Sequence, residues 1–228
     1  MRIKIKKSGR ENLVKKENGN KMIEIKKLIS IGSNCIGTDI LHFANLRIPS
    51  PVDNFSGFNI WKAYLLFNKE IKRSLFHEDY ESRPATSIEK ERFFYFQKVF
   101  TFNHNFMIVH NDFENKKFQK ALKKRIQLFY NYYKLSLKEP TLWYVYSLDE
   151  NDKYIDENFM KEIISTLPDC CKNRLICIGM RGKNSLFAKY FKYYLEFDEL
   201  KYNWHSEEQA RNIMKQYELS FNLKFNME

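Results

Sequence analysis

Apolar and polar positions alternate along several short stretches of this chain and recur at helical spacing along others, which predicts strands separated by helices. From Met22 the pattern alternates and then turns apolar up to Ile31, as a strand entering a core does. Four apolar residues with helical spacing predict a helix after this strand: Ile36, Ile40, Leu41 and Ala44. Two prolines, Pro49 and Pro51, break that helix and start an extended loop over residues 52–58.

The rest of the chain predicts further helices and strands in alternation. A helix over 60–67 and strands over 93–100 and 105–109 precede a long amphipathic helix near 117–136, whose apolar face carries Leu122, Ile126, Phe129 and Tyr133. Strands are then expected at 141–146, 174–179 and 193–197, with helices at 158–167 and after Ser206, where Gln209 completes a capping box. This rhythm predicts an α/β or α+β fold, a mixed sheet flanked by helices, in one domain over residues 22–228.

Composition supports this class. With 228 residues, 43% of them apolar, the chain can bury one sizeable core, and only 7 Gly and 5 Pro argue against a turn-rich β-sandwich. The 20 Phe and 14 Tyr are expected mainly in that core.

The net charge of +11 is concentrated at one end. Residues 1–27 hold 10 Lys or Arg and 3 Glu, which leaves only +4 for the other 201 residues. We expect a basic, flexible extension over residues 1–21, with Met22 as a candidate start. Because no nucleic-acid-binding motif accompanies the charge, the sequence does not favour a nucleic-acid partner. Neither a secretory leader nor an 18-residue apolar run is found, so a cytoplasmic location is expected.

The four cysteines, Cys35, Cys170, Cys171 and Cys177, do not resemble a disulfide framework. Cys177 falls in an apolar strand and is expected to be a buried small hydrophobic residue. Cysteine and histidine spacings fit no zinc site, and neither a phosphate-binding nor a dinucleotide-binding glycine motif occurs. The sequence therefore calls for no metal and no cofactor.

Cys35 is the strongest candidate for chemistry. It follows the strand and the turn Gly32-Ser33-Asn34 and opens the predicted helix. A thiol at a helix N-terminus is stabilised as the thiolate, which is the nucleophilic form. Its own N–H, with Ser33 or Asn34, could bind an oxyanion. Alternatively, Ser33 or Asn34 is simply the N-cap and Cys35 a small residue packed beneath the helix.

Thiol chemistry also needs a base, and His110 is the best placed of the five histidines. It ends the predicted strand 105–109, and Asp112 follows two residues later on the same side of an extended segment. A carboxylate there could orient and stabilise the imidazole. The alternative is a surface turn that caps the helix near Lys117.

Three segments together resemble a known family: Ile31 to Cys35, Pro51 to Phe55, and His110 to Phe113. Their order and spacing resemble an uncharacterised bacterial domain family described as papain-like cysteine peptidases. The resemblance implies Cys35 as nucleophile, His110 as general base, Asp112 as the residue that orients it, and Asp53 as a residue that lines or braces the site. Val52 and Asn54 depart from the aromatic residues usual in the family, and Asn111 separates the histidine from its carboxylate.

Three function classes remain open from the sequence. The leading one is a thiol hydrolase or acyltransferase that uses a Cys35–His110 pair on a peptide, amide or acyl substrate, without a cofactor. The second is a non-catalytic binding module with a basic tail. The third is an ester hydrolase with Ser33 as nucleophile, although the later Asp-x-x-His pair that this chemistry normally uses is not found.

Overall fold

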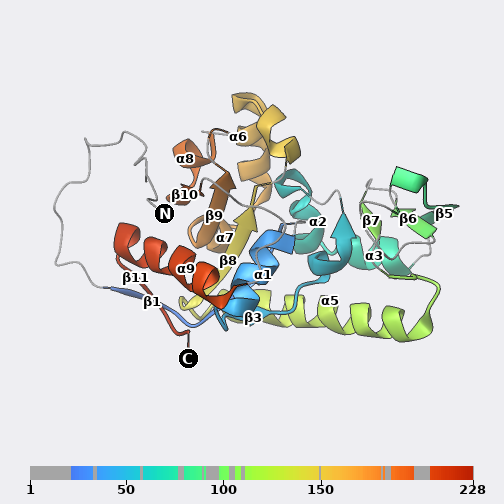
Figure 1. Ribbon diagram of the computed structural model, residues 1–228, viewed down its shortest axis with the longest axis horizontal. Helices are drawn as coiled ribbons and strands as arrows, with labels where there is room; N and C mark the ends of the chain where they lie inside the picture. Colours follow the sequence, from blue (N-terminus) through green and yellow to red (C-terminus); the bar gives the residue numbers. More distant parts are fainter. Residues whose placement is uncertain are drawn as a thin grey trace.

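The computed structural model of the chain describes residues 22–32, 35–56, 59–76, 80–88, 90, 98–102, 106–108, 111–148, 150–180, 182, 186–197 and 206–227. For Cys35, Ile36, Asn54, Ser56, Glu150 and Asn151 only the backbone is described. Within these ranges the chain forms a parallel sheet between two layers of helices and a smaller antiparallel sheet at one end (Figure 1). This confirms the expected class, in which parallel and antiparallel strands are flanked by helices.

The described part of the parallel sheet has five strands in the order β10-β9-β8-β2-β3. Their bounds are β2 Lys27–Ser30, β3 Arg47–Ile48, β8 Leu142–Ser147, β9 Leu175–Met180 and β10 Tyr193–Phe197. Numbered along the chain, the order is 2-1-3-4-5, one of the two common arrangements of doubly wound sheets. The direction of winding reverses between β2 and β8, where Leu28 pairs with Trp143 and Ser30 with Val145.

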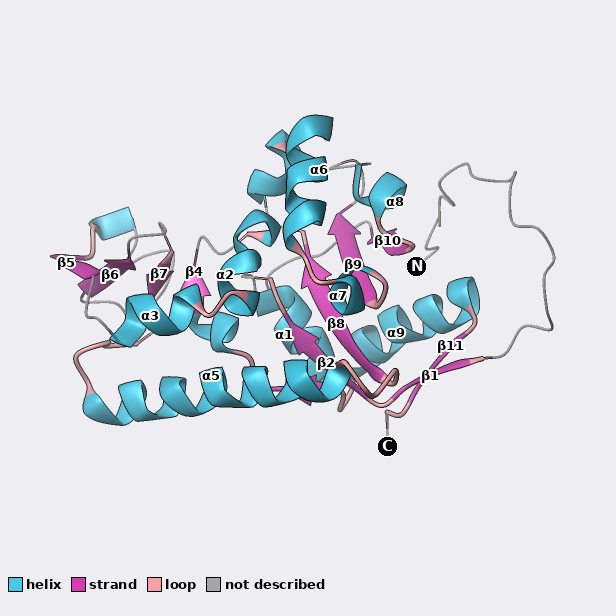
Figure 2. Cartoon of the chain, turned by 180° about the vertical axis from the view of Figure 1, so that it is seen from behind, coloured by secondary structure: helices cyan, strands magenta, loops and turns pink. Residues whose placement is uncertain are grey.

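Alternate residues of the strands face opposite helix layers. On β8, Trp143 and Val145 belong to the apolar cluster that includes α1 (Cys35–Phe43) and α9 (Glu207–Phe221). Tyr144 and Tyr146 belong instead to the cluster that includes α5 (Lys116–Ser136), α6 (Glu157–Thr166) and α8 (Leu186–Tyr190). The layer of α5 and α6 lies in front of the sheet in Figure 2, and that of α1 and α9 in Figure 1. Because both faces are covered, β8 and β9 consist almost wholly of buried residues.

The long helix α5 connects the two sheets (Figure 2). The Asn115 side chain caps its start by accepting the Lys117 N–H at 2.9 Å. At its other end the Arg174 guanidinium donates to the carbonyls of Ser136 at 2.6 Å, Glu139 at 2.8 Å and Leu142 at 3.1 Å. Arg174 therefore ties the end of α5 to the beginning of β8, in the place where a cation also complements the helix dipole.

Between β3 and α5 the described chain contains the antiparallel sheet, with strands in the order β4-β7-β6-β5, and several short helices. The elements of this region are η1 Pro51–Asn54, β4 Phe55–Ser56, η2 Ile60–Lys62, α2 Tyr64–Phe67, α3 Glu70–Phe76, β5 Tyr80–Pro84, β6 Lys98–Phe102 and β7 Met107–Ile108. Its core is aromatic: Phe102 stacks on Phe106 with ring centroids 4.9 Å apart, and Phe113 packs edge-on against Phe102 at 5.2 Å. Many of the aromatic residues are thus core residues, as expected.

The first and last described strands pair with each other. β1 (Ile23–Ile25) runs parallel to β11 (Leu223–Phe225), and Ile23 lies opposite Leu223. Ser206 caps α9 by accepting the Gln209 N–H at 3.2 Å, as its sequence predicts. The left-handed Asn222, with φ of 55°, ends α9 and turns the chain into β11.

Most of the predicted elements of the second half are confirmed, including the amphipathic helix, while α7 (Asp169–Lys172) was not expected. The expectation of one helix over 60–67 was wrong, because Ala63 separates η2 from α2. The loop expected after Ile48 contains a helical turn, because Ser50 and Asp53 form a capping box around Pro51. Residues 1–21 lie outside the described ranges. No helix in the described part of the chain has the length and apolar character needed to cross a membrane.

Candidate functional site

The turn after β2 lies at the point where the winding of the parallel sheet reverses. Cys35 is the first residue of α1 and follows the carboxyl end of β2 after a four-residue connection, Ile31 to Asn34. Doubly wound sheets bind their ligands in the crevice outside this point. The strand and the helix that the local sequence predicts are confirmed, while two of the three residues of the predicted turn lie outside the described ranges. Ser33, Asn34 and the Cys35 side chain lie outside what the structure describes.

The two strands at the reversal are packed closely around this turn. A Cβ atom added to Gly32 would lie 2.6 Å from Cδ2 of Tyr146, a fully buried residue of β8, so only glycine fits there. One residue further along β8, the Ser147 hydroxyl accepts the N–H of Gly37 in the first turn of α1 at 3.2 Å. The end of β8 thus supports both the turn and the beginning of α1.

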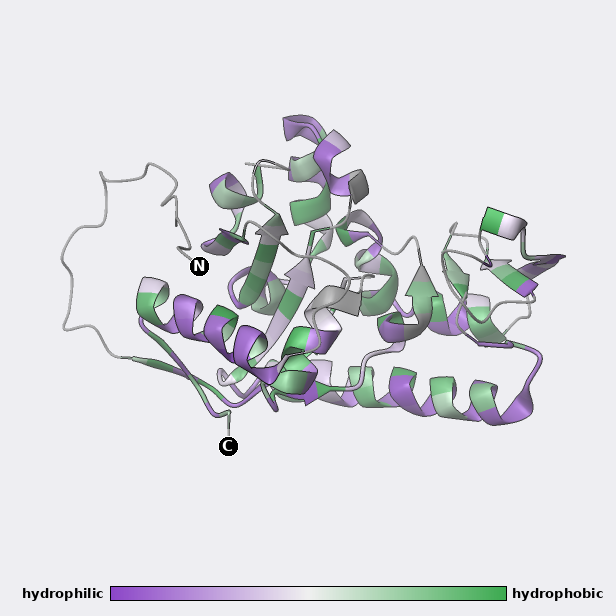
Figure 3. Cartoon of the chain, viewed as in Figure 1, coloured by the Kyte–Doolittle hydropathy of each residue, from purple (hydrophilic) through white to green (hydrophobic). Residues whose placement is uncertain are grey.

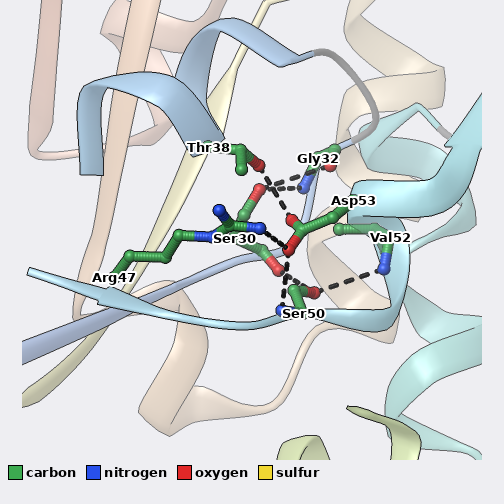
Figure 4. A network of polar contacts seen from close by, with 7 residues as sticks. All are labelled: Ser30, Gly32, Thr38, Arg47, Ser50, Val52 and Asp53. Atoms are coloured by element: carbon green, nitrogen blue, oxygen red, sulfur yellow. Dashed lines mark hydrogen bonds and ion pairs between the residues drawn. The ribbon is translucent and has the colours of Figure 1, made fainter. Parts of the chain in front are cut away.

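Asp53 joins α1 to the chain that follows β3 (Figure 4). Its side chain is only 5% exposed and its two oxygens accept three hydrogen bonds. Oδ1 accepts the Thr38 hydroxyl of α1 at 2.8 Å, and Oδ2 accepts Nη2 of Arg47 at 2.6 Å and the N–H of Ser50 at 3.0 Å. Thr38 lies three residues after Cys35, about one helical turn away. Asp53 therefore braces α1 close to Cys35.

Two serines extend this network to the carboxyl end of β2. The buried Ser50 hydroxyl donates to the carbonyl of Ser30 at 2.7 Å and accepts the N–H of Val52 at 3.3 Å. The Ser30 hydroxyl lies 3.4 Å from the N–H of Gly32, which donates to it. The end of β2, the turn that follows it and the η1 segment are thereby held as one unit.

The segment around His110 is described only on either side of that residue. Ile108 of β7 pairs with Phe55 of β4, two residues after Asp53. Asp112 is exposed, and its Oδ1 accepts the N–H of Glu114 at 2.9 Å. This bond is typical of a turn that leads into a helix, and among the described residues Oδ2 accepts no hydrogen bond. His110 itself lies outside the described residues.

The other cysteines differ in their surroundings from a nucleophile. Cys171 and Cys177 are fully buried, and burial raises the pKa of each thiol well above its ordinary value. Cys170 is half-buried. Buried thiols of high pKa are inert, so Cys171 and Cys177 serve as core residues, as expected for Cys177.

One buried acid near the reversal of the sheet is not predicted by the sequence. Asp152, in η3 (Glu150–Tyr154), is fully buried and accepts the hydroxyl hydrogen of Tyr146, whose oxygen in turn accepts the N–H of Ile60 at 3.1 Å. The surrounding run, residues 149–153, is wholly polar and is typical of a solvated loop. No local signal marked Asp152, because the aromatic partner that pairs with it comes from the preceding strand.

Comparison of the chain with models of protein families, with curated proteins and with solved structures finds no match. The papain-like resemblance and the residue roles it implies therefore stay predictions.

Proposed function

We propose that this protein is a cysteine-dependent hydrolase or acyltransferase in which Cys35 attacks the carbonyl carbon of a peptide, amide or acyl substrate. One observation carries the proposal: α1 begins at Cys35, directly beyond the reversal point between β2 and β8. A thiol at a helix N-terminus is favoured as the thiolate by the positive end of the helix dipole. A crevice at this point of a doubly wound sheet is the usual place for a ligand.

In the proposed mechanism His110 takes the proton from the Cys35 thiol and later delivers it to the leaving group. The Cys35 sulfur forms a thioester with the acyl group while the bond to the leaving group breaks, and water or a second acceptor then cleaves the thioester. Support for His110 comes from the pairing of Ile108 with Phe55, which brings β7 next to the chain that carries Asp53. Asp112 would orient the imidazole through Oδ2, and Ser33 or Asn34 would assist the Cys35 N–H in binding the oxyanion.

The first test is the pH dependence of iodoacetamide labelling, resolved for each cysteine by peptide mass spectrometry. We expect Cys35 to react well below about pH 8 and His110→Ala to move its reactivity toward the ordinary thiol value of about 8.5. The matched control is His104→Ala, which changes a histidine six residues earlier and should leave the profile unchanged. Cys171 and Cys177 provide internal references, because burial raises the pKa of both thiols. Ordinary thiol behaviour of Cys35 in the wild type would contradict the proposal.

Turnover of fluorogenic ester, thioester and peptide-amide substrates by variants then shows whether Cys35 or Ser33 is the nucleophile. Cys35→Ala should abolish turnover while the circular dichroism spectrum stays that of the wild type. Ser33→Ala should retain it in part, since Ser33 only assists. Loss of turnover in Ser33→Ala, with activity retained in Cys35→Ala, would instead identify a serine-dependent ester hydrolase. The proposal includes a reducing, cytoplasmic location, in which Cys35 stays a free thiol.

A further inference from the structure

A hollow of about 300 Å³ lies at the β3 edge of the parallel sheet, away from the first turn of α1. It is lined by His42, Asn45, Arg47, Pro49 and Arg125. These residues come from the end of α1 and the turn after it, from β3 and its continuation, and from the middle of α5. Two guanidinium groups and an imidazole thus converge on a space large enough for a small ligand.

The charge around the hollow is predominantly positive. The Lys27 ammonium donates to the carbonyl of Asn45 at 3.1 Å, which adds a cation beside the lining. Arg125 forms no hydrogen bond or ion pair with any other residue that the structure describes. On the described elements that line the hollow and on the continuation of β3, the acids are Asp39, one turn before His42 on α1, and Asp53, which is bound to Arg47. Positive charge at this edge therefore exceeds negative charge.

Arg47 itself has unused donors. Its Nη2 binds Asp53, but its Nε is buried and has no acceptor among the described residues. A buried donor without a partner is costly, and a guanidinium offers five N–H groups in one plane. Because Nε is closed off from solvent, an oxyanion in the hollow would bind the outer guanidinium nitrogens; Nη1 donates to no residue that the structure describes.

The helix that supplies Arg125 adds to this positive potential. α5 contains six Lys and one Arg in 21 residues and no Asp or Glu. It alternates hydrophilic and hydrophobic residues along its length at the lower edge of the molecule (Figure 3). Such a row of cations raises the local concentration of anions near the hollow.

We propose that this hollow binds the phosphate group of a small phosphorylated ligand, held by Arg125 and Arg47 with His42 at its rim. Guanidinium groups match the geometry and the charge of phosphate oxygens better than other side chains do. The ligand would also be sensed at α1, because Arg47 is bonded to Asp53 and Asp53 to Thr38. This site is independent of the proposed thiol chemistry, since binding is measured directly and needs no turnover.

The test is isothermal titration calorimetry of the full chain with inorganic phosphate, at constant ionic strength set by sodium chloride. We expect saturable binding in the wild type and at least about tenfold weaker binding in Arg125→Gln, the loss of one charge-assisted contact. The matched control is Lys134→Gln, which makes the same charge change on α5 about 13 Å further along the axis. It should weaken binding by less than about twofold.

His42→Gln is a second variant, at an exposed residue, and should also weaken binding if Arg125→Gln fails to fold. Three results would overturn the proposal. They are the absence of saturable binding, equal weakening by Arg125→Gln and Lys134→Gln, and acetate binding as tightly as phosphate. The second would show a diffuse electrostatic effect of α5, and the third a general carboxylate site.

Discussion

Replacing Asp53 by Asn tests whether this buried carboxylate holds α1 in place. The substitution keeps the size of the side chain but removes its charge and one of its two acceptor oxygens. Either the Thr38 hydroxyl or the pair formed by Arg47 and the Ser50 N–H then faces an NH2 group. A hydrogen bond to a charged group contributes about 1.5–3 kcal/mol. Because the Arg47 side chain is 27% exposed, water offsets part of its loss. We expect Asp53→Asn to lower the free energy of unfolding by about 2–4 kcal/mol.

Urea and thermal unfolding followed by circular dichroism measure this loss. For a chain of this length it corresponds to a fall in Tm of about 4–16 °C. Thr38→Val removes one donor to this carboxylate and leaves the ion pair intact, so it should cost about 1.5–2 kcal/mol, the lower part of the range for a bond to a charged group. A double-mutant cycle of Arg47→Gln with Asp53→Asn should show a coupling of about 1–3 kcal/mol. If Asp53→Asn unfolds within about 0.5 kcal/mol of the wild type, the network does not stabilise α1 and the reasoning fails.

Three further predictions concern the core. Gly32→Ala should lower the free energy of unfolding by about 1–3 kcal/mol in urea, because its Cβ would overlap the buried Tyr146 ring. The control is Gly182→Ala: Gly182 has φ of 71°, but a Cβ there would meet no atom within 4 Å, so it should cost only about 1 kcal/mol. An equal loss of stability in the two variants would show that overlap with the Tyr146 ring is not the cause. Arg174→Lys should cost about 2 kcal/mol, since an ammonium cannot reach the carbonyls that the guanidinium binds; an unchanged urea midpoint would contradict this. Burial raises the pKa of several tyrosines in the folded state, so the stability present at neutral pH should fall as the pH rises above about 10, where the unfolded chain loses these protons. The tyrosines are Tyr132, Tyr144, Tyr194 and Tyr217. A urea midpoint that is the same at about pH 8 and about pH 11 would contradict it.

Local patterns predicted the elements whose signals are local. The spacing of Leu122, Ile126 and Phe129 is enough to define α5, and Ser206 marks the start of α9. By contrast, β3 is only two residues long and is followed directly by a proline, so no periodicity could reveal it. β5 is largely exposed on both faces, which hides the alternation expected of a strand. Strand order depends on pairing between distant segments and could not be obtained from periodicity at all.

In the candidate site, too, local features were predictable from the sequence and contacts between distant segments were not. The placement of Cys35 at the start of a helix followed from a strand, a turn and a helical spacing that are contiguous in the sequence. The bond between Asp53 and Thr38 joins residues 15 positions apart, and no local pattern signals it; only the family resemblance pointed to Asp53. The burial of Asp152 likewise depends on Tyr146 and on the packing of the sheet. Pairing of His110 with Cys35 stays a prediction for the labelling experiment.

The pairing of β1 with β11 has a consequence for the synthesis of the chain. Ile23 leaves the ribosome 200 residues before its partner Leu223. At about 5–20 residues per second, β1 waits roughly 10–40 s for the strand that completes its edge. β2 at the centre of the sheet also waits for β8, more than a hundred residues later. The sheet edges are therefore expected to be completed only late in synthesis, and until then these strand edges are the ones that chaperones would have to cover.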